Sequence, residues 1–246
     1  MKRFLLSAIG LIGIAAPALA ADMGVPYTKT PVMIPAFYDW SGVYLGLNGG
    51  WGTEQRCFDV VTTAGTFVAA DGCHTTSGGV AGGQIGFRWQ VSSWVFGIES
   101  QGDWANLQGS SVSLTAPANT NLSRMDAFGL FTGHVGYAFD TTLLYLKGGA
   151  AVISDRNDIA TNGIVVATAP GDNRWGGTIG LGAEFSFAPN WSAAVQYDHL
   201  FIGNYTTTFN ATTGGVFSTD RVGGGSDIFT VRVNYRWGGP VIPKYW

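Results

Sequence analysis

The chain has few charged residues, cysteines and histidines for its length, and each shortage narrows the classes of protein it can belong to. Only 12% of its 246 residues are Asp, Glu, Lys or Arg, and the formal net charge is −3. Basic residues do not cluster among aromatic ones, so no nucleic-acid partner is expected. The two cysteines and three histidines lack the spacing of a zinc site. No Gly-x-Ser-x-Gly turn frames a serine nucleophile. We therefore expect no catalytic site, no cofactor and no metal.

Long apolar runs are missing after the first twenty residues. Lys2 and Arg3 precede the apolar run 4–16, and small residues follow at 18–20. This order predicts a secretory signal peptide over residues 1–20, cleaved after Ala20 or Ala21. The run is shorter than the ~20 residues that a helix needs to span a membrane. If the mature chain enters a membrane, it does so as strands, because only helices and closed barrels satisfy the backbone in lipid.

In place of long runs, the chain alternates apolar and polar residues. Between Trp94 and Trp104 one parity carries Trp, Phe and Ile, and the other carries Glu99, Gln101 and Asp103. The segment from Phe229 to Trp237 repeats the pattern. A period of two indicates strands with two unlike faces, here apolar faces bordered by aromatic residues and faces bearing charges of both signs. That combination suits a barrel that is apolar toward lipid and polar within. A soluble lipocalin-like carrier would need the reverse.

Eight segments carry this alternation, and their connections alternate between short and long. The expected fold is an all-β, eight-stranded antiparallel up-and-down transmembrane β-barrel over residues 40–237. It follows an extended lead-in with three prolines (21–39) and precedes a periplasmic C-terminal tail (238–246). Short periplasmic turns and long external loops are typical of outer-membrane barrels, and they put both termini in the periplasm. The expected strands are 41–52, 77–89, 94–105, 124–139, 143–153, 174–187, 191–202 and 226–237. The expected short turns are 90–93, 140–142 and 188–190, and the expected long loops are 53–76, 106–123, 154–173 and 203–225.

Every charged residue in these segments is expected to face the lumen, with His199 alone misplaced. Eight strands enclose an interior only just wide enough for side chains to fill, so the inward charges must pair. Glu99, Lys147, Glu184 and Arg232 are expected in one cross-lumen network. The full predicted lumen charge network is Arg88, Glu99, Lys147, Glu184, Arg232 and Arg236, and the wider inward set adds Asp103, Arg124, Asp126 and Asp198. Glycines within the strands are expected to make room for large inward side chains.

The two cysteines enclose fifteen residues in an exported chain. Cys57 and Cys73 are therefore expected to form one disulfide in the first external loop. His74, beside Cys73, is expected to be solvated there, with a haem or metal role as the alternative.

Several motifs together resemble the porin-like outer-membrane β-barrel family of alphaproteobacteria, small barrels related in architecture to the OmpA transmembrane domain. The motifs lie at 40–46, 133–140, 144–150, 182–185, 190–193 and 231–240 and cover essentially the whole mature chain. The sequence departs from the family at Thr132 and His134, which stand where an arginine pair is common. It also leaves open whether Trp237 or Trp246 is the terminal aromatic residue used in barrel assembly.

The resemblance implies an abundant protein of the cell outer membrane that supports envelope integrity and is exposed to the surroundings. Expected partners are outer-membrane lipid, lipopolysaccharide and the barrel assembly machinery. Two alternatives to a structural barrel with a plugged lumen stay open. One is a small diffusion pore, and the other is a surface receptor that binds haem or a host component through the external loops.

Overall fold

The computed structural model describes residues 38–237, in which nine antiparallel strands and no helix occur. Residues 38–237 therefore contain no helix long and apolar enough to cross a membrane. The predicted signal peptide, residues 21–37 of the lead-in and the tail 238–246 lie outside the described residues. The strands are β1 (Gly42–Val61), β2 (Phe67–Val91), β3 (Trp94–Val112), β4 (Asn119–Phe139), β5 (Thr142–Thr161), β6 (Ile164–Thr168), β7 (Asp172–Ala188), β8 (Trp191–Ala211) and β9 (Val216–Trp237).

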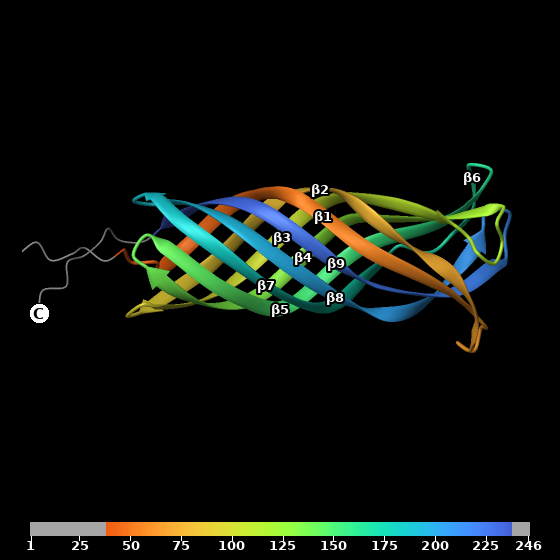
Figure 1. Cartoon of the computed structure of the whole chain (residues 1–246), viewed down its shortest axis with the longest axis horizontal. Coiled ribbons are helices and arrows are strands. Elements are labelled where there is room, and N and C mark those ends of the chain that lie inside the picture. Colours follow the sequence, from red (N-terminus) through yellow and green to blue (C-terminus); the bar gives the residue numbers. More distant parts are fainter. Residues whose placement is uncertain (1–37, 238–246) are drawn as a thin grey trace, which may run out of the picture. The chain divides into compact units, whose positions relative to one another are not determined.

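Eight of these strands close into a ring, which confirms the predicted barrel (Figure 1). Each strand pairs antiparallel with its neighbour, and β1 completes the ring by pairing with both β2 and β9. The strand count differs from the expected eight because β6 is extra. This five-residue strand pairs with the end of β5 and with Ala211 and Asn210 of β8, beyond the first residue of β7. It extends one hairpin and is not part of the ring.

The three short turns lie where the alternation predicts them. They comprise Ser92–Ser93, Asp140–Thr141 and Pro189–Asn190, and Ser92 and Asp140 adopt positive φ angles of 57° and 54°. We call this end of the barrel the short-turn end and the opposite end the hairpin end.

The predicted long loops are wrong, because the strands continue through most of them. Residues outside strands at the hairpin end are only 62–66, 113–118, 162–163, 169–171 and 212–215. The twenty residues of β1, at about 3.3 Å per residue and a tilt of about 40°, span roughly 50 Å, about twice the ~25 Å apolar band of such barrels. Just beyond the band the outward residues of β1 and β3 are polar or small, among them Thr53, Gln55, Asn106 and Gln108, and large apolar side chains return only at the hairpin tips. The alternation that marks a lipid-facing strand therefore fades while the strand pairing continues.

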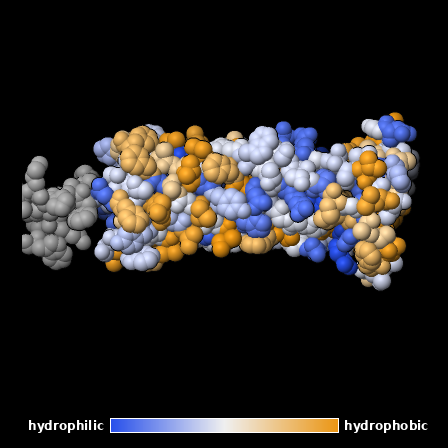
Figure 2. All heavy atoms as spheres, viewed as in Figure 1, coloured by the Kyte–Doolittle hydropathy of each residue, from blue (hydrophilic) through white to orange (hydrophobic). Residues whose placement is uncertain are grey.

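The outward face shows where the membrane lies along the barrel. Apolar side chains gather over the half nearer the short turns, polar ones follow in the middle, and apolar ones return at the hairpin end (Figure 2). The lipid-facing band is bordered by exposed tryptophans. Those near the short turns are Trp89, Trp94, Trp191 and Trp237, and those at the far border are Trp51, Trp104 and Trp175.

Three charged residues expected inside face outward, so this part of the prediction is wrong. Arg124 and Asp126 form an exposed ion pair, with Arg124 Nε 2.5 Å from Asp126 Oδ1. A bulge between Met125 and Ala127 shifts the register of β4 and reverses its parity. Asp227 shares the outward parity of Phe229, and its carboxylate accepts a hydrogen bond from Tyr197.

Candidate functional site

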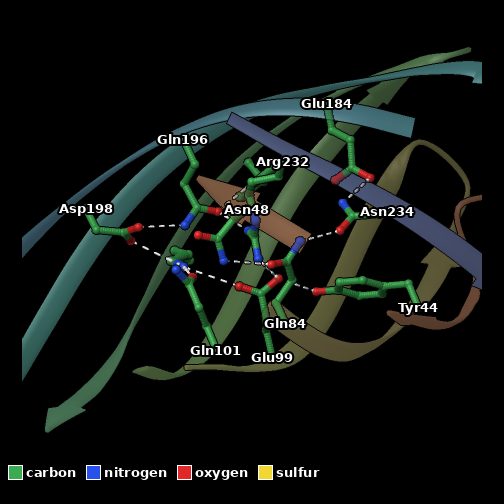
Figure 3. A network of polar contacts seen from close by, with 12 residues as sticks. Tyr44, Asn48, Gln84, Glu99, Gln101, Glu184, Gln196, Asp198, Arg232 and Asn234 are labelled. Atoms are coloured by element: carbon green, nitrogen blue, oxygen red, sulfur yellow. Dashed lines mark hydrogen bonds and ion pairs between the residues drawn. The ribbon is translucent and has the colours of Figure 1, made fainter. Parts of the chain in front are cut away.

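A buried polar layer crosses the lumen at the level of the membrane band, centred on Glu99 of β3 (Figure 3). Glu99 Oε2 lies 2.8 Å from an Arg232 guanidinium nitrogen and accepts a 2.7 Å hydrogen bond from the Tyr44 hydroxyl. Glu99 Oε1 lies 3.3 Å from Lys147 Nζ, which is also 3.3 Å from Asp198 Oδ1. Five strands, β1, β3, β5, β8 and β9, are thus tied together across the lumen.

A second arm of the layer centres on Glu184 of β7. Its carboxylate lies 2.8 Å from Arg88 Nη2 and accepts hydrogen bonds from Ser192 and Asn234. The Arg88 guanidinium stacks 4.1 Å over the ring of Tyr44, whose hydroxyl binds Glu99, so the two arms meet. All of these charged side chains are buried, and each is matched by an opposite charge, as burial requires.

Five of the six residues of the predicted lumen charge network therefore lie in one layer, and Arg236 does not. Arg236 donates to the backbone oxygens of Asp39 and Ser41 and stacks 4.8 Å over Tyr38 at the short-turn end. Of the wider inward set, Asp103 and Asp198 are buried inside, and Asp103 accepts a 2.8 Å hydrogen bond from Gln101.

A plug at the short-turn end was missed by the sequence reading. Trp40, only 1% exposed, donates from its indole nitrogen to the Asp140 carbonyl, and its backbone nitrogen donates to Gln90. Tyr38 and Trp40 pack with four inward side chains into a buried cluster, completed by Val95, Ala138, Leu143 and Tyr145. The residues just before β1 thus fold beneath the lumen. No alternation marks them: Tyr38 falls in the predicted lead-in, and Trp40 opens the predicted barrel just before its first expected strand.

An apolar layer lies beyond the polar one, although the interior was expected to be polar. Ten buried side chains form it: Val80, Ala105, Leu107, Met125, Phe128, Leu130, Ala151, Ile153, Leu200 and Ile228. A bulge in β4 brings part of this set inside. The register shift between Met125 and Ala127 turns Met125 inward, whereas Leu107 keeps the inward parity of Glu99 and Asp103 on β3. Sequence parity counted through a bulge gives the wrong face.

A further charge cluster lies toward the hairpin end, in segments that had been predicted as loops. A nitrogen of the Arg56 guanidinium lies 2.8 Å from Glu54 Oε1 and 2.5 Å from Asp155 Oδ2, and Arg174 lies 3.4 Å from Asp155 Oδ1. Burial raises the pKa of Glu54, against the opposing effect of Arg56. A second apolar cluster lies above it, made of Phe58, Ile159, Ala167, Ala169, Phe209 and Val222.

Two carboxylates near the hairpin tips have opposite environments. Hydrogen bonds from Ser113, Thr115 and Asn121 to Asp71 lower its pKa, although burial acts in the other direction. Burial, together with the neighbouring charge of Asp71, raises the pKa of Asp220 to about 6. Asp220 lies within the predicted loop 203–225, but its side chain is buried.

Glycines permit two of the large inward side chains, as expected. A Cβ on Gly86 would lie 2.4 Å from the Tyr44 ring, and a Cβ on Gly182 would lie 2.4 Å from the Tyr145 ring. Any larger residue at these two positions would displace the aromatic side chains that line the polar layer.

The three histidines lie apart from one another. His74 is buried, stacks on Phe58 and lies 3.0 Å from the Ser111 hydroxyl, so the expectation that it is solvated in a loop is wrong. His134 faces the lumen beside Tyr145. His199 faces outward, as expected, with Nδ1 2.7 Å from Asp227. Within residues 38–237 no three or more His, Cys, Asp or Glu side chains are grouped to hold a metal ion.

The disulfide prediction is confirmed. Cys57 of β1 and Cys73 of β2 are direct register partners and are bonded to each other. The bond lies within a strand pair rather than in an open loop.

Comparison with known proteins agrees with this geometry. A family model described as "Outer membrane protein beta-barrel domain" matches residues 6–237. The chain belongs to this family. One relative of this chain is the 31 kDa outer-membrane immunogenic protein of Brucella melitensis. It is 27% identical over 217 residues, covering 82% of this chain and 88% of the relative. The Brucella suis protein of the same name matches equally. The predicted resemblance to alphaproteobacterial outer-membrane barrels is confirmed, and with it the outer-membrane location.

Solved structures share the barrel. The outer-membrane protease OmpT of Escherichia coli has a TM-score of 0.52 at 8% identity, over 80% of this chain and 97% of OmpT. OprG of Pseudomonas aeruginosa has a TM-score of 0.50 at 10% identity, over 83% of this chain and 99% of OprG. At identities this low, the likeness of OmpT and OprG to this chain shows only that the three proteins share the barrel fold.

Proposed function

We propose that this outer-membrane β-barrel is a structural, non-enzymatic envelope protein whose lumen is closed. Both termini and the short turns lie in the periplasm, and the four hairpins project from the cell. The observation that carries the proposal is the filled interior. From the short turns outward, the lumen holds the Tyr38–Trp40 plug, the polar layer centred on Glu99, the apolar layer around Leu107, and the Arg56 cluster capped by apolar side chains.

Conductance tests the closed lumen. Purified monomer, refolded and shown to be folded by its heat-dependent migration on a detergent gel, is inserted into a planar bilayer beside a wide general porin as the positive control. The expected result is no steady channel. Stable conductance steps of porin size, with sugar-sized solutes passing, would replace the closed barrel with the diffusion pore.

Cysteine labelling tests the orientation. The native cysteines are bonded to each other, so a single new cysteine is the only free thiol. On intact cells a membrane-impermeant maleimide is expected to label Thr63→Cys at a hairpin tip and not Ser92→Cys in a short turn. Labelling of Ser92→Cys alone would invert the proposed topology.

The hairpin tips favour a second candidate role, as a surface receptor for an apolar partner. Each tip exposes large apolar side chains in water, including Phe67 (55%), Leu114 (69%), Ile164 (71%) and Val216 (65%). No charged residue occurs in 60–70, 109–122, 159–171 or 208–219. Exposed apolar patches of this kind mark interaction sites. The Brucella relatives are named as immunogenic proteins, which supports exposure of the same end here.

Adhesion measurements test this second role. Cells that display the protein are expected to bind apolar beads in preference to charged ones. Replacing the four tip residues above with Thr should abolish the preference. If the fourfold variant is present at the surface in equal amount and its cells bind apolar beads as well as wild-type cells do, the tips are not the binding surface.

A further inference from the structure

A hollow opens on the outward face between β8 and β9, just beyond the aromatic border of the membrane band. Its volume is about 390 Å³, and it is lined by residues that include Gln55, His199, Phe201, Gly225 and Asp227. Two features of the sequence create it. A bulge between Ile202 and Tyr205 places two residues of β8 opposite Gly223, and the run Gly223–Gly225 of β9 supplies no side chains to fill the space.

Hydrogen bonds hold polar side chains in place at the short-turn side of this hollow. Asp227 Oδ1 accepts a 2.6 Å hydrogen bond from the Tyr197 hydroxyl and lies 2.7 Å from His199 Nδ1. The ring of Phe201 packs edge-on against His199 at 4.4 Å between centroids. A carboxylate and an imidazole thus meet beside an exposed aromatic ring, and Gln55 also lines the hollow. The flanking residues nearer the short turns on this face are apolar.

A second groove, of about 510 Å³, runs over the lipid-facing surface on the short-turn side of the hollow. Its lining includes Trp94 near the short turns, Leu146 and Leu181 in the middle, and Tyr197 and Phe229 at the far border. Tyr197 and Phe229 are register partners, and His199 and Asp227 are the next outward pair along the same two strands. Tyr197 therefore lines the apolar groove while its hydroxyl binds the carboxylate of the polar hollow.

We propose that the hollow and the groove form one binding site for a lipid with an uncharged, hydroxyl-bearing headgroup. The acyl chain lies in the apolar groove, and sugar-type hydroxyls donate to Asp227 and contact Gln55 in the hollow. No Lys or Arg lines the hollow, and its carboxylate repels phosphate, so the charges favour a neutral glycolipid headgroup over a phospholipid one. The site depends on the barrel crossing the membrane at its aromatic borders and not on the closed lumen.

Solution NMR with a defined amphiphile tests the site. The full mature chain is refolded in dodecylphosphocholine micelles, and dodecyl maltoside, which has the same chain length and a sugar headgroup, is titrated in. Saturable shifts are expected at the His199 ring and the Gly225 amide, while maltose without a chain gives no saturation. Shifts that grow linearly and equally at Gly79, an exposed glycine across from Trp51, would show detergent exchange and overturn the proposal.

Variants with a matched control complete the test. A Cβ at Gly203 or Gly79 meets nothing within 4 Å, so both positions accept a larger side chain. Gly203 also lines the hollow, so Gly203→Val should weaken dodecyl maltoside binding at least tenfold, and Gly79→Val on β2 should leave it unchanged. Asp227→Asn should weaken it several-fold by removing the charged acceptor. Unchanged binding in folded Gly203→Val protein, or saturation by maltose alone, overturns the proposal without bearing on the conductance of the lumen.

Discussion

At the scale of single residues, a side chain's environment on this barrel depends on which of two surroundings its strand parity selects. Outward residues of the membrane band meet lipid, where a charge has no partner, and inward residues meet a packed lumen in which every charge of the polar layer has one. A change of charge therefore alters stability for different physical reasons on the two faces. Three substitutions illustrate these reasons.

Leu146→Arg places a charge in the middle of the lipid-facing band, where Leu146 is 60% exposed. We expect it to lower the free energy of unfolding by roughly 2–4 kcal/mol, the cost of Arg near the bilayer midplane. Urea titration in lipid vesicles measures it. Thr75→Arg, at an exposed outward position beyond the band and opposite Gln55, is the control, and an equal loss in that variant would mean that the band is misplaced.

Arg232→Met removes one of the two cations that neutralise Glu99 and leaves a buried carboxylate with Lys147 alone. Breaking a buried pair from one side costs about 3–5 kcal/mol, and the remaining lysine should keep the loss near the lower value. Adding Glu99→Gln should recover part of the loss, because the unpaired charge disappears. If the double variant is less stable than Arg232→Met, the charge pairing is not what Arg232 contributes.

Asp220→Asn should stabilise the protein at neutral pH. The pKa of Asp220 is raised to about 6 by burial and by Asp71, so the folded state holds its proton more tightly than the unfolded chain does. Stability from this group is present below its ordinary pKa and is lost as pH rises through 6. At pH 7.5 the variant should gain on the order of 2 kcal/mol. Unfolding curves at pH 5 and pH 7.5 test this, and the difference between variant and wild type should shrink at pH 5.

At the scale of strands, sequence alternation locates the part of each strand that crosses the membrane. It does not locate the strand beyond the membrane, where lipid no longer selects apolar outward residues. The three short turns and the outward rows from Val43 to Trp51 and from Phe229 to Trp237 follow the alternation, because lipid selects apolar residues at every second position. Bulges are not visible in a period of two, so the alternation predicts the wrong face for Arg124 and Asp126. Beyond the band, water contacts the outer face. The extensions of β1 to Val61 and of β3 to Val112 therefore lack the alternating apolar residues that would identify them as strands.

The first hairpin shows what a disulfide adds to such an extension. Cys57 and Cys73 close fifteen residues, for which chain entropy gives roughly 3 kcal/mol. Because the strand pairing continues on both sides of the bond, Cys57→Ser with Cys73→Ser should leave heat-dependent migration unchanged. The tip 62–66 should then be cleaved faster by an added protease. Loss of the folded band in the double variant would show that the barrel needs the bond to form.

At the scale of the whole barrel, layers of different chemistry fill the lumen one above another. The short-turn plug, the polar layer and the apolar layer are built from separate side chains, so the proposed closure of the lumen does not depend on any one of them. Tyr38→Gly with Trp40→Gly should therefore lower stability, since two buried aromatic side chains are lost, and should still give no steady conductance in a planar bilayer. The hydrogen bonds of Trp40 to Gln90 and Asp140 show that this plug is packed and not loosely placed. If the double variant conducts while the wild type does not, the plug alone closes the barrel, and the layers above it must leave a water-filled path.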